Sequence, residues 1–403
     1  MEQMILQDIC KVYDCPHTTA KDEGIGIPLV RTPNIGKGRL LLTNAHRVNS
    51  DIYQERTRRA IPEEDDIIIA REAPVGNAAI IQMGQKVCLG QRVVLLKPIR
   101  DRVDPNYLVY YLLSDEIQHR LRIHANGAVV AHLNMADIRN LPVSLPSLSE
   151  QKKIGRVLKI IDDKIELNRR INDNLEQQAQ ALFKSWFVDF EPFKDGKFVE
   201  TEMGMIPEGW KVVQLGEIIE ISKRIINPQK NPDKIFYHYS LPACDNGLIP
   251  EIQSGKDIMS NKIILQNNTI LFSKLNPRIK RIWFACDVLN DSICSTEFIP
   301  YRAKNERESV YIYSIINSDS FYASVLGCVN GATGSHQRFH AEDTLGLLFP
   351  YKKDIVDKYI DLVKPILAEI HKLRIENKTL ALTRDSLLPR LMSGELKVND
   401  LNC

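Results

Sequence analysis

The residues SEQKKIGRVLKIIDDKIELNRRINDNLEQQAQALFKSWFVDFEPF, Ser149 to Phe193, carry the most regular pattern in this chain. Apolar side chains recur there at multiples of seven positions, at Ile154, Ile161, Leu175 and Leu182, while charged and amide side chains fill much of the rest. This spacing predicts a long helix with one apolar stripe, capped by Ser149. A helix of about 35 residues is a rod of roughly 50 Å. It needs a partner helix to cover its stripe.

A matching stripe near the end of the chain supplies that partner. Ile161 and Ile165 lie 205 positions before Ile366 and Ile370. Asn168 falls on the first stripe where the second has Leu373, and a polar residue at such a position affects register. We therefore predict that the two helices pair as a coiled coil. The residues predicted to form this interface are Ile154, Ile161, Ile165, Leu175, Leu182, Ile366, Ile370, Leu380 and Leu387.

The remainder of the chain also contains repeated blocks. DDIIIAREAPVG, Asp65 to Gly76, aligns with NTILFSKLNPRI, Asn268 to Ile279, because in both an apolar run meets a basic residue and then a proline three positions later. NGAVVAH, Asn126 to His132, aligns with NGATGSH, Asn330 to His336, at nearly the same offset. Blocks in one order at nearly one offset predict an internal repeat with pseudo-two-fold symmetry.

Each copy is predicted to be a mixed α/β unit. Short apolar runs at 39–43, 86–96 and 281–288 have the length of strands, and helices are expected at 105–121 and 308–326. The predicted fold class is therefore α+β, with two mixed α/β units separated by two long antiparallel coiled-coil helices. The predicted boundaries are 1–147 for the first unit, 148–187 for the first helix, 188–210 for a connector with several Gly and Pro residues, 211–351 for the second unit and 352–396 for the second helix.

Composition indicates an ordinary soluble globular protein. A chain of 403 residues predicts two or three domains, and a 44% share of hydrophobic residues is enough to build cores. The formal net charge is only +2, so any contact with nucleic acid must come from local basic patches. No apolar run approaches the roughly 18 residues needed to cross a bilayer, and the N-terminus lacks the basic start of a signal peptide. We expect a cytoplasmic protein.

No pattern in the sequence points to catalysis. A Walker A loop is absent. Residues 104–107, which resemble a methyltransferase loop, are better interpreted as the start of a helix, and the charged triplet 162–164 lies on the polar face of the predicted coiled coil. Cys10, Cys15 and His17 lie close together, but no second ligand pair follows. We expect free thiols, no metal site and no catalytic residue.

Local charge is more informative than net charge. Four cations without an acid fall within 274–281, and seven cations fall within 31–59. A DNA backbone requires such basic patches, and Arg or Lys in loops also reads guanine edges. His132 and His336 occupy matching positions of the repeat, where each either ties two elements together or contacts a phosphate or base. The predicted DNA-binding residues are Arg31, Lys37, Arg39, Arg56, Arg58, Arg59, His132, Lys274, Arg278, Lys280, Arg281, His336 and Arg338.

The layout as a whole resembles the specificity subunit of type I restriction-modification systems. The motifs that carry this resemblance are SEQ at 149–151, WFVDF at 186–190, IPEGW at 206–210 and LLPRLMSGEL at 387–396. Each motif alone is weak, but their combination in this order is specific. The resemblance covers essentially the whole chain.

The resemblance implies a DNA-binding role without catalysis. In that family two target recognition domains each read one half of a split DNA site, and two antiparallel helices hold them apart. The implied partners are double-stranded DNA, two methylation subunits and restriction subunits in a prokaryotic cytoplasm. S-adenosylmethionine, ATP and Mg are expected on those partners and no cofactor in this chain. The alternative is a duplicated coiled-coil adaptor that binds proteins without DNA specificity, and the salt dependence of DNA binding distinguishes the two.

Overall fold

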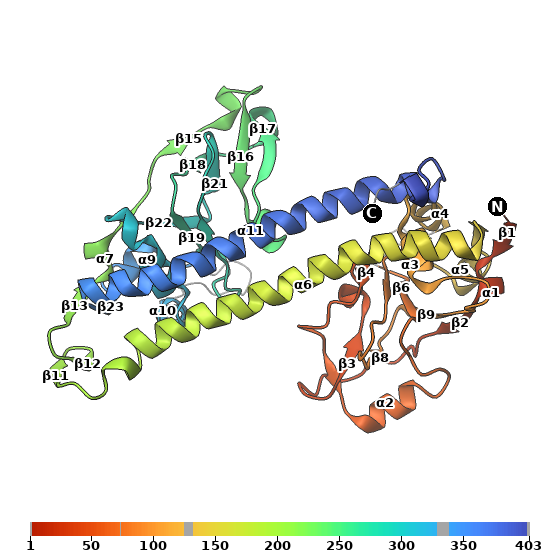
Figure 1. The fold of residues 1–403 in the computed structure, drawn as a ribbon, viewed down its shortest axis with the longest axis horizontal. Helices are drawn as coiled ribbons and strands as arrows, with labels where there is room; N and C mark the ends of the chain where they lie inside the picture. The colour runs from red at the N-terminus through yellow and green to blue at the C-terminus, as the bar shows by residue number, and fades with distance from the viewer. Residues whose placement is uncertain (1, 73, 125–131, 329–337, 401–403) are drawn as a thin grey trace. The chain divides into compact units, whose positions relative to one another are not determined.

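The structure is a computed structural model of the chain, and it describes residues 2–72, 74–124, 132–328 and 338–400. The chain forms two compact units (Figure 1). Unit 1 comprises Met1–Ile165 and Thr379–Cys403, and unit 2 comprises Glu166–Lys378. Two 40-residue helices, α6 (Leu148–Phe187) and α11 (Lys353–Met392), each contribute one part to each unit.

The centre of unit 1 is a five-stranded sheet with the order β2-β9-β6-β7-β4. Strand β6 is apolar along its whole length because both of its faces are covered. Ile67 and Ile69 belong to the core shared with the helices, while Ile68 and Ala70 pack toward a second sheet, β5-β3-β8. Figure 1 shows this second sheet, with α2 (Ser50–Arg56), on the side of the unit away from α6. The strands are β2 (Cys10–Asp14), β3 (Ile27–Val30), β4 (Gly38–Arg39), β5 (Arg47–Val48), β6 (Ile67–Ala70), β7 (Ala78–Ile80), β8 (Cys88–Leu89) and β9 (Val93–Pro98).

Short helices cover the inner face of this sheet. The sequence predicted one helix over 105–121, but the chain forms two helices that meet at Ser114, whose extended backbone ends the first of them. Asp104 caps that first helix by accepting a hydrogen bond from the Tyr107 N–H at 2.9 Å. A two-stranded ladder, β1–β10, then leads into α6. These elements are α1 (Leu6–Ile9), α3 (Pro105–Leu113), α4 (Asp115–His124), α5 (Met135–Arg139), β1 (Glu2–Ile5) and β10 (Pro142–Leu145).

Unit 2 uses the same strand order. Its four-stranded sheet runs β14-β22-β19-β20, which matches β2-β9-β6-β7 of unit 1. Its second sheet, β15-β18-β21-β16-β17, contains a parallel pair, β16–β21, that matches the parallel pair β3–β8. Strand β19 is buried throughout, as β6 is, and its side chains alternate between two cores, with Ile270 and Phe272 facing the helices and Leu271 facing the second sheet. The strands are β14 (Ile219–Ile221), β15 (Ile225–Ile226), β16 (Ile235–Tyr239), β17 (Glu251–Ser254), β18 (Lys262–Ile264), β19 (Thr269–Ser273), β20 (Ile282–Ala285), β21 (Ser292–Ser295) and β22 (Phe298–Ala303).

The helices of unit 2 repeat the break seen in unit 1. The single helix predicted over 308–326 is two helices that meet at Ser318, whose hydroxyl accepts a hydrogen bond from the Phe321 N–H at 3.2 Å. The predicted connector, 188–210, contains an antiparallel hairpin, β11–β12. The remaining elements are α7 (Leu215–Ile218), α8 (Leu241–Asp245), α9 (Ser309–Asn317), α10 (Asp319–Gly327), β11 (Phe198–Thr201), β12 (Gly204–Pro207), β13 (Lys211–Gln214) and β23 (Leu348–Tyr351).

Three local predictions need correction. The cap of α6 is Ser147 and not Ser149, because the Ser147 hydroxyl faces Glu150 in a Ser-x-x-Glu capping box. The strand predicted over 39–43 shrinks to Gly38–Arg39. The run predicted over 86–96 divides into β8 and β9, because Arg92 has a φ of +63°, which is incompatible with a continuous strand.

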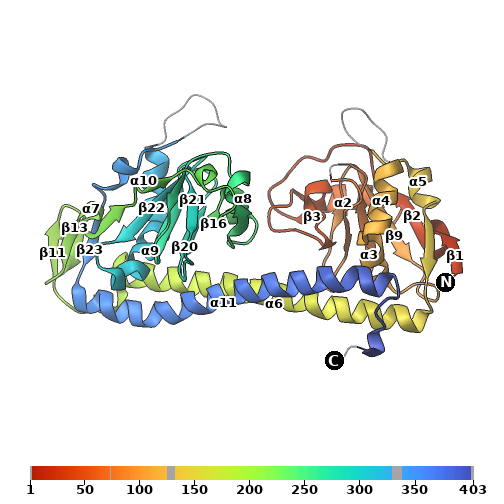
Figure 2. The ribbon, with the colours of Figure 1, turned by 90° about the horizontal axis from the view of Figure 1, so that it is seen from above.

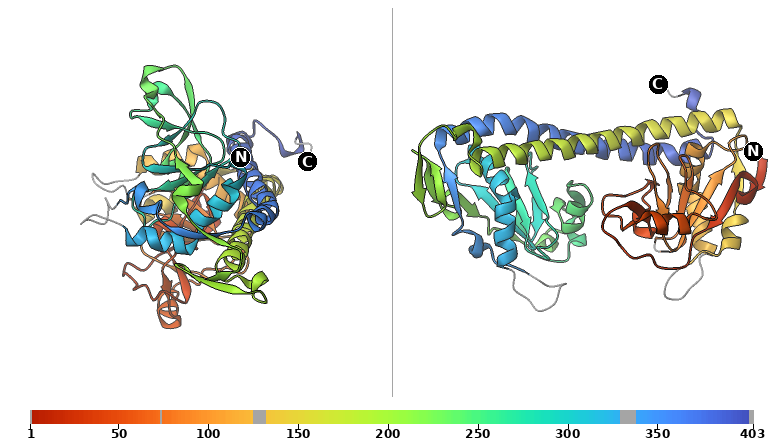
Figure 3. Two further views of the ribbon diagram at one scale, coloured as in Figure 1. Left: turned by 90° about the vertical axis from the view of Figure 1, so that its left-hand side faces the viewer. Right: turned by 90° about the horizontal axis from the view of Figure 1, so that it is seen from below.

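Within each unit the α6 and α11 segments lie side by side (Figures 2 and 3). In unit 1 Ile154 shares a core with Leu391, and in unit 2 Phe183 shares a core with Tyr359. The contacts therefore run in opposite directions along the two helices. In the described ranges of the chain, no helix is long and apolar enough to cross a membrane.

Candidate DNA interface

The end of β6 in unit 1 carries a network of charged side chains. Arg71, the residue after β6, donates one hydrogen bond to Asp14 and another to the carbonyl of Leu133, both at 2.9 Å. A third contact joins its guanidinium to Nε2 of His132 at 2.9 Å. Because a guanidinium only donates, Nε2 of His132 is the acceptor, and the proton of this histidine resides on Nδ1, 3.2 Å from Glu72. His132 thus ties two elements together, one of the two roles predicted for it.

The corresponding edge of unit 2 is built differently. Lys274 follows β19 as Arg71 follows β6, but its described contact is a backbone hydrogen bond from its N–H to the carbonyl of Glu297 at 2.9 Å. Arg338 donates two hydrogen bonds to Glu297, at 3.0 and 3.2 Å, and its backbone forms a bridge with Leu275. The predicted partner of His132, His336, lies outside the described residues. The Arg338 guanidinium is therefore held beside the loop that begins at Lys274.

The basic loop 274–281 presents fewer free cations than the sequence suggests. Arg278 is exposed, and Lys274 is partly exposed. Lys280 instead donates to the carbonyl of Asn317 at 2.6 Å, and Arg281 donates twice to Asp245, at 2.6 and 2.9 Å. Two of the four cations therefore have partners within the protein, and that all four face DNA stays a prediction.

The basic segment 31–59 of unit 1 is corrected at Arg56. Its side chain is buried, and it donates to the carbonyls of Leu89 and Thr18 at 2.8 and 2.9 Å. Arg56 thus holds α2 against β8, and its buried guanidinium is not available to a phosphate. The remaining predicted cations of this segment keep surface exposure, fully at Lys37, Arg58 and Arg59 and partly at Arg31 and Arg39.

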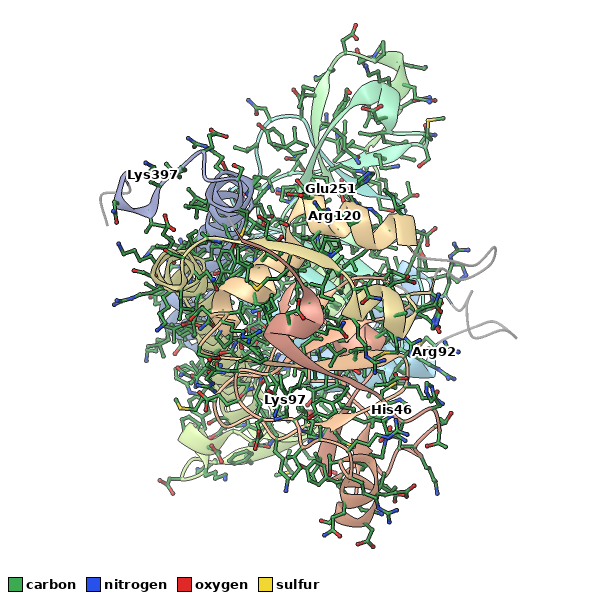
Figure 4. The ribbon with its side chains drawn as sticks, turned by 90° about the vertical axis from the view of Figure 1, so that its right-hand side faces the viewer. His46, Arg92, Lys97, Arg120, Glu251 and Lys397 are labelled. Carbon is green, nitrogen blue, oxygen red and sulfur yellow. The ribbon has the colours of Figure 1, made fainter. Side chains whose placement is uncertain are left out.

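The two ends of β9 differ in character. Arg92 precedes the strand and pairs with Glu72 at 3.0 Å, next to the His132 network. Lys97, near the other end, contacts both Glu63 and Asp66, at 2.5 and 2.9 Å. Burial raises the pKa of the Asp66 carboxyl. Figure 4 shows Arg92 and Lys97 well apart. The Lys97 end is an internal ion-pair cluster and not a candidate DNA contact.

The residues predicted to pair the helices occupy the inner faces of α6 and α11. Ile154, Ile165 and Ile370 are buried. The other predicted residues are partly buried, namely Ile161, Leu175, Leu182, Ile366, Leu380 and Leu387. The predicted set left out part of the interface. Most of the sevenfold stripe is only partly buried, whereas Leu158, Phe183, Phe187 and Tyr359 are almost completely buried in the cores.

Buried polar contacts also hold α6 and α11 together. In unit 1 Asp162 accepts a hydrogen bond from Arg384 at 2.6 Å and another from the Tyr110 hydroxyl at 2.7 Å. In unit 2 the fully buried Asn168 donates to Glu376 and Asn377, at 2.9 and 3.0 Å. The sequence placed Asp162 on a solvated face, so its role as an acceptor for two elements was missed.

The cysteines are free thiols in the described part of the chain. Burial raises the pKa of the Cys88 thiol to about 11, so it is protonated at neutral pH. Among the described residues, Cys10, Cys15 and His17 are not brought together into a metal-ligand group.

Comparison with known proteins agrees with this architecture. A family model described as the type I restriction modification DNA specificity domain matches residues 1–177. The MjaIX type I restriction enzyme specificity subunit of Methanocaldococcus jannaschii is 27% identical over 370 residues, which cover 88% of this chain and 82% of that protein. The HindI specificity subunit of Haemophilus influenzae is 31% identical over 144 residues, 34% of this chain and 31% of that protein.

A solved structure supports the fold. The crystal structure of a type I restriction-modification S subunit from M. genitalium aligns with a TM-score of 0.53 at 15% identity, covering 97% of this chain and 95% of that one. At this identity the likeness concerns the fold alone. Residues 1–177 thus match the type I restriction modification DNA specificity domain, and most of the chain is similar in sequence to a type I restriction enzyme specificity subunit.

Proposed function

We propose that units 1 and 2 are two target recognition domains, and that the chain reads a bipartite DNA sequence with one unit for each half-site. The observation that carries this proposal is the shared strand order of the two units, β2-β9-β6-β7 and β14-β22-β19-β20. One chain thus contains two versions of one fold, as a reader of two different half-sites requires. The family match names DNA specificity as the role of this fold.

The long helices are proposed to act as the spacer between the readers, as an antiparallel coiled coil that relates two pseudo-two-fold repeats. Support comes from inside each unit, where α6 and α11 segments share a core. Because neither unit is complete without both helices, a spacer made of them is part of each reader. The distance between the two readers sets the length of DNA between the half-sites, since one turn of duplex is about 34 Å long.

The DNA contacts are proposed to come from exposed cations on the loops. Lys37, Arg58 and Arg59 of unit 1 and Lys274 and Arg278 of unit 2 are fully or partly exposed. Cations of this kind supply the salt-dependent part of DNA affinity. Arg31, Arg39, His132, His336 and Arg338 stay in the predicted set of DNA-binding residues.

The chemistry is proposed to reside on partner proteins. Two methylation subunits would transfer a methyl group from S-adenosylmethionine to adenine, and restriction subunits would use ATP and Mg. This assignment rests on the family and on the lack of a catalytic motif in the sequence. The chain itself would contribute only sequence recognition.

The test is to express the chain with type I methylation subunits in a host that lacks adenine methylation. Sequencing that detects modified adenine should then report one bipartite motif, absent when this chain is omitted. Methylation that does not depend on this chain would contradict the proposal. A chain that binds DNA with no preference and no steep salt dependence would instead favour the adaptor.

A further inference from the structure

Three side chains of unit 2 with metal-binding chemistry meet beside helix α11. Cys286 and Asp287 follow β20, and His371 lies on α11. The thiol sulfur, a carboxylate oxygen and an imidazole nitrogen all lie within 4.8 Å of one another. Nε2 of His371 is 3.9 Å from Oδ2 of Asp287. Figure 2 shows one end of β20 close to α11.

We propose that Cys286, Asp287 and His371 form a binding site for a divalent metal ion of the zinc class, which joins the turn after β20 to helix α11. No spacing in the sequence points to this site, because 84 positions separate Asp287 from His371. The site lies within unit 2 and is independent of the proposed DNA contacts.

The geometry is close to what such an ion needs. Tetrahedral zinc binds sulfur at about 2.3 Å and nitrogen or oxygen at about 2.0 to 2.2 Å, which places ligand atoms roughly 3.2 to 3.8 Å apart. Separations of up to 4.8 Å require a closure of at most about 1.0 to 1.6 Å. Asp287 provides the movement, because its side chain is 82% exposed while that of His371 is 28% exposed. The backbone of Asp287 has a φ of +55°, a strained conformation of the kind that gathers at functional sites.

The ligand types select the metal. One thiolate, one imidazole and one carboxylate suit zinc, whereas calcium and magnesium prefer oxygen ligands alone. The three residues line an open cavity of about 920 Å³, which leaves room for water as a fourth ligand and gives the ion a path of entry. Arg374, one turn further along α11, acts electrostatically on both Cys286 and His371, and its guanidinium forms an ion pair with Glu176.

The experiment titrates the full chain, freed of metal by chelator, with Co²⁺ and then with Zn²⁺. One Co²⁺ per chain should bind with the near-ultraviolet band of a cobalt–thiolate bond and the strong visible bands of tetrahedral cobalt, and Zn²⁺ should displace it. Cys286→Ser should abolish the thiolate band, and His371→Gln should weaken binding at least tenfold. The matched control is Cys328→Ser, since Cys328 is the other partly exposed cysteine of unit 2 and lies outside the site. It should bind like the parent.

Two results would overturn the proposal. One is a thiolate band that persists in Cys286→Ser or disappears in Cys328→Ser, which would place the metal elsewhere. The other is parental affinity in His371→Gln. That variant also protects the test against a folding failure of Cys286→Ser, because the partly exposed His371 tolerates replacement, and circular dichroism without metal checks that both variants are folded.

Discussion

Units 1 and 2 share a strand order but pack the long helices with different side chains. In unit 1 the apolar contact of Ile154 with Leu391 is joined by a polar group, Asp162, which accepts hydrogen bonds from Arg384 and Tyr110. In unit 2 the buried polar contact of Asn168 with Glu376 is joined by an aromatic cluster, in which the Phe187 ring centroid lies 4.9 Å from that of Tyr311 and 5.1 Å from that of Tyr359.

One pair of repeat-related residues shows this divergence directly. Tyr110 and Ser314 lie 204 positions apart, on α3 and α9, at the same offset as the helix ends at Ser114 and Ser318. Tyr110 donates its hydroxyl to Asp162, and burial raises its pKa. Ser314 instead accepts a hydrogen bond from the hydroxyl of Tyr359 on α11 at 2.7 Å. The two units therefore share the strand order that the backbone ladders specify, while their packing against the helices differs side chain by side chain.

The largest expected effect comes from removing residues 379–403. Unit 1 then loses Leu391, Leu387 and Arg384, while unit 2 keeps every residue assigned to it. Exposing Ile154 and Leu158 should cost unit 1 on the order of several kcal/mol. Hydrogen–deuterium exchange should accelerate in β6 and β9 and stay slow in β19 and β22. Equal loss of protection in both units would mean that the units do not depend separately on the helices.

The next effect is expected at the aromatic cluster. Phe187→Ala removes a buried ring from the core of unit 2 and should lower the free energy of unfolding of that unit by about 3 to 5 kcal/mol. Denaturant unfolding followed by exchange in β19 measures this. Ile171→Ala is the control on the same helix, because Ile171 is 37% exposed and its loss should cost less than about 1 kcal/mol. Comparable costs at both positions would show that the cluster is not what holds α6.

A smaller effect is expected at the polar contact of unit 1. Arg384→Met leaves the Asp162 carboxylate with one partner and should destabilise unit 1 by about 1 to 3 kcal/mol. A double-mutant cycle with Asp162→Asn isolates the pair. Glu369 and Lys372, an exposed pair on α11, provide the comparison and should couple by only about 0.2 to 0.5 kcal/mol. If Asp162 and Arg384 couple as weakly as this exposed pair does, the distinction between the two units is removed.

The smallest expected effect concerns DNA. Arg278→Ala should weaken binding of all sequences and reduce the slope of log affinity against log salt by about one, provided that Arg278 contacts a phosphate. Arg281→Ala should leave that slope unchanged, because Arg281 is already paired with Asp245. Filter binding over a range of salt concentrations measures both. If Arg281→Ala reduced the slope of log affinity against log salt and Arg278→Ala did not, the assignment of Arg278 as the DNA contact would be wrong.

Sequence reasoning succeeded where a pattern is long and local. The apolar periodicity of α6 extends over many turns, so this helix could be predicted without a structure. The apolar runs of β6 and β19 align with each other in the sequence, so these strands could be predicted as well. It failed where a residue's role depends on a distant partner. Arg56 looked like a DNA contact because its acceptors, at Leu89 and Thr18, lie far away in the sequence. Arg281 and Asp245, and the group of Cys286 with His371, were hidden for the same reason.

The central claim is that each unit reads one half-site, and an exchange of one unit tests it most directly. Residues 211–351 are replaced by the corresponding segment of a relative whose bipartite site differs in both halves, and the hybrid is expressed with the methylation subunits. Mapping of methylated adenine should show one half of the motif changed and the other half and the spacing retained. A motif changed in both halves, or in neither, would contradict the claim.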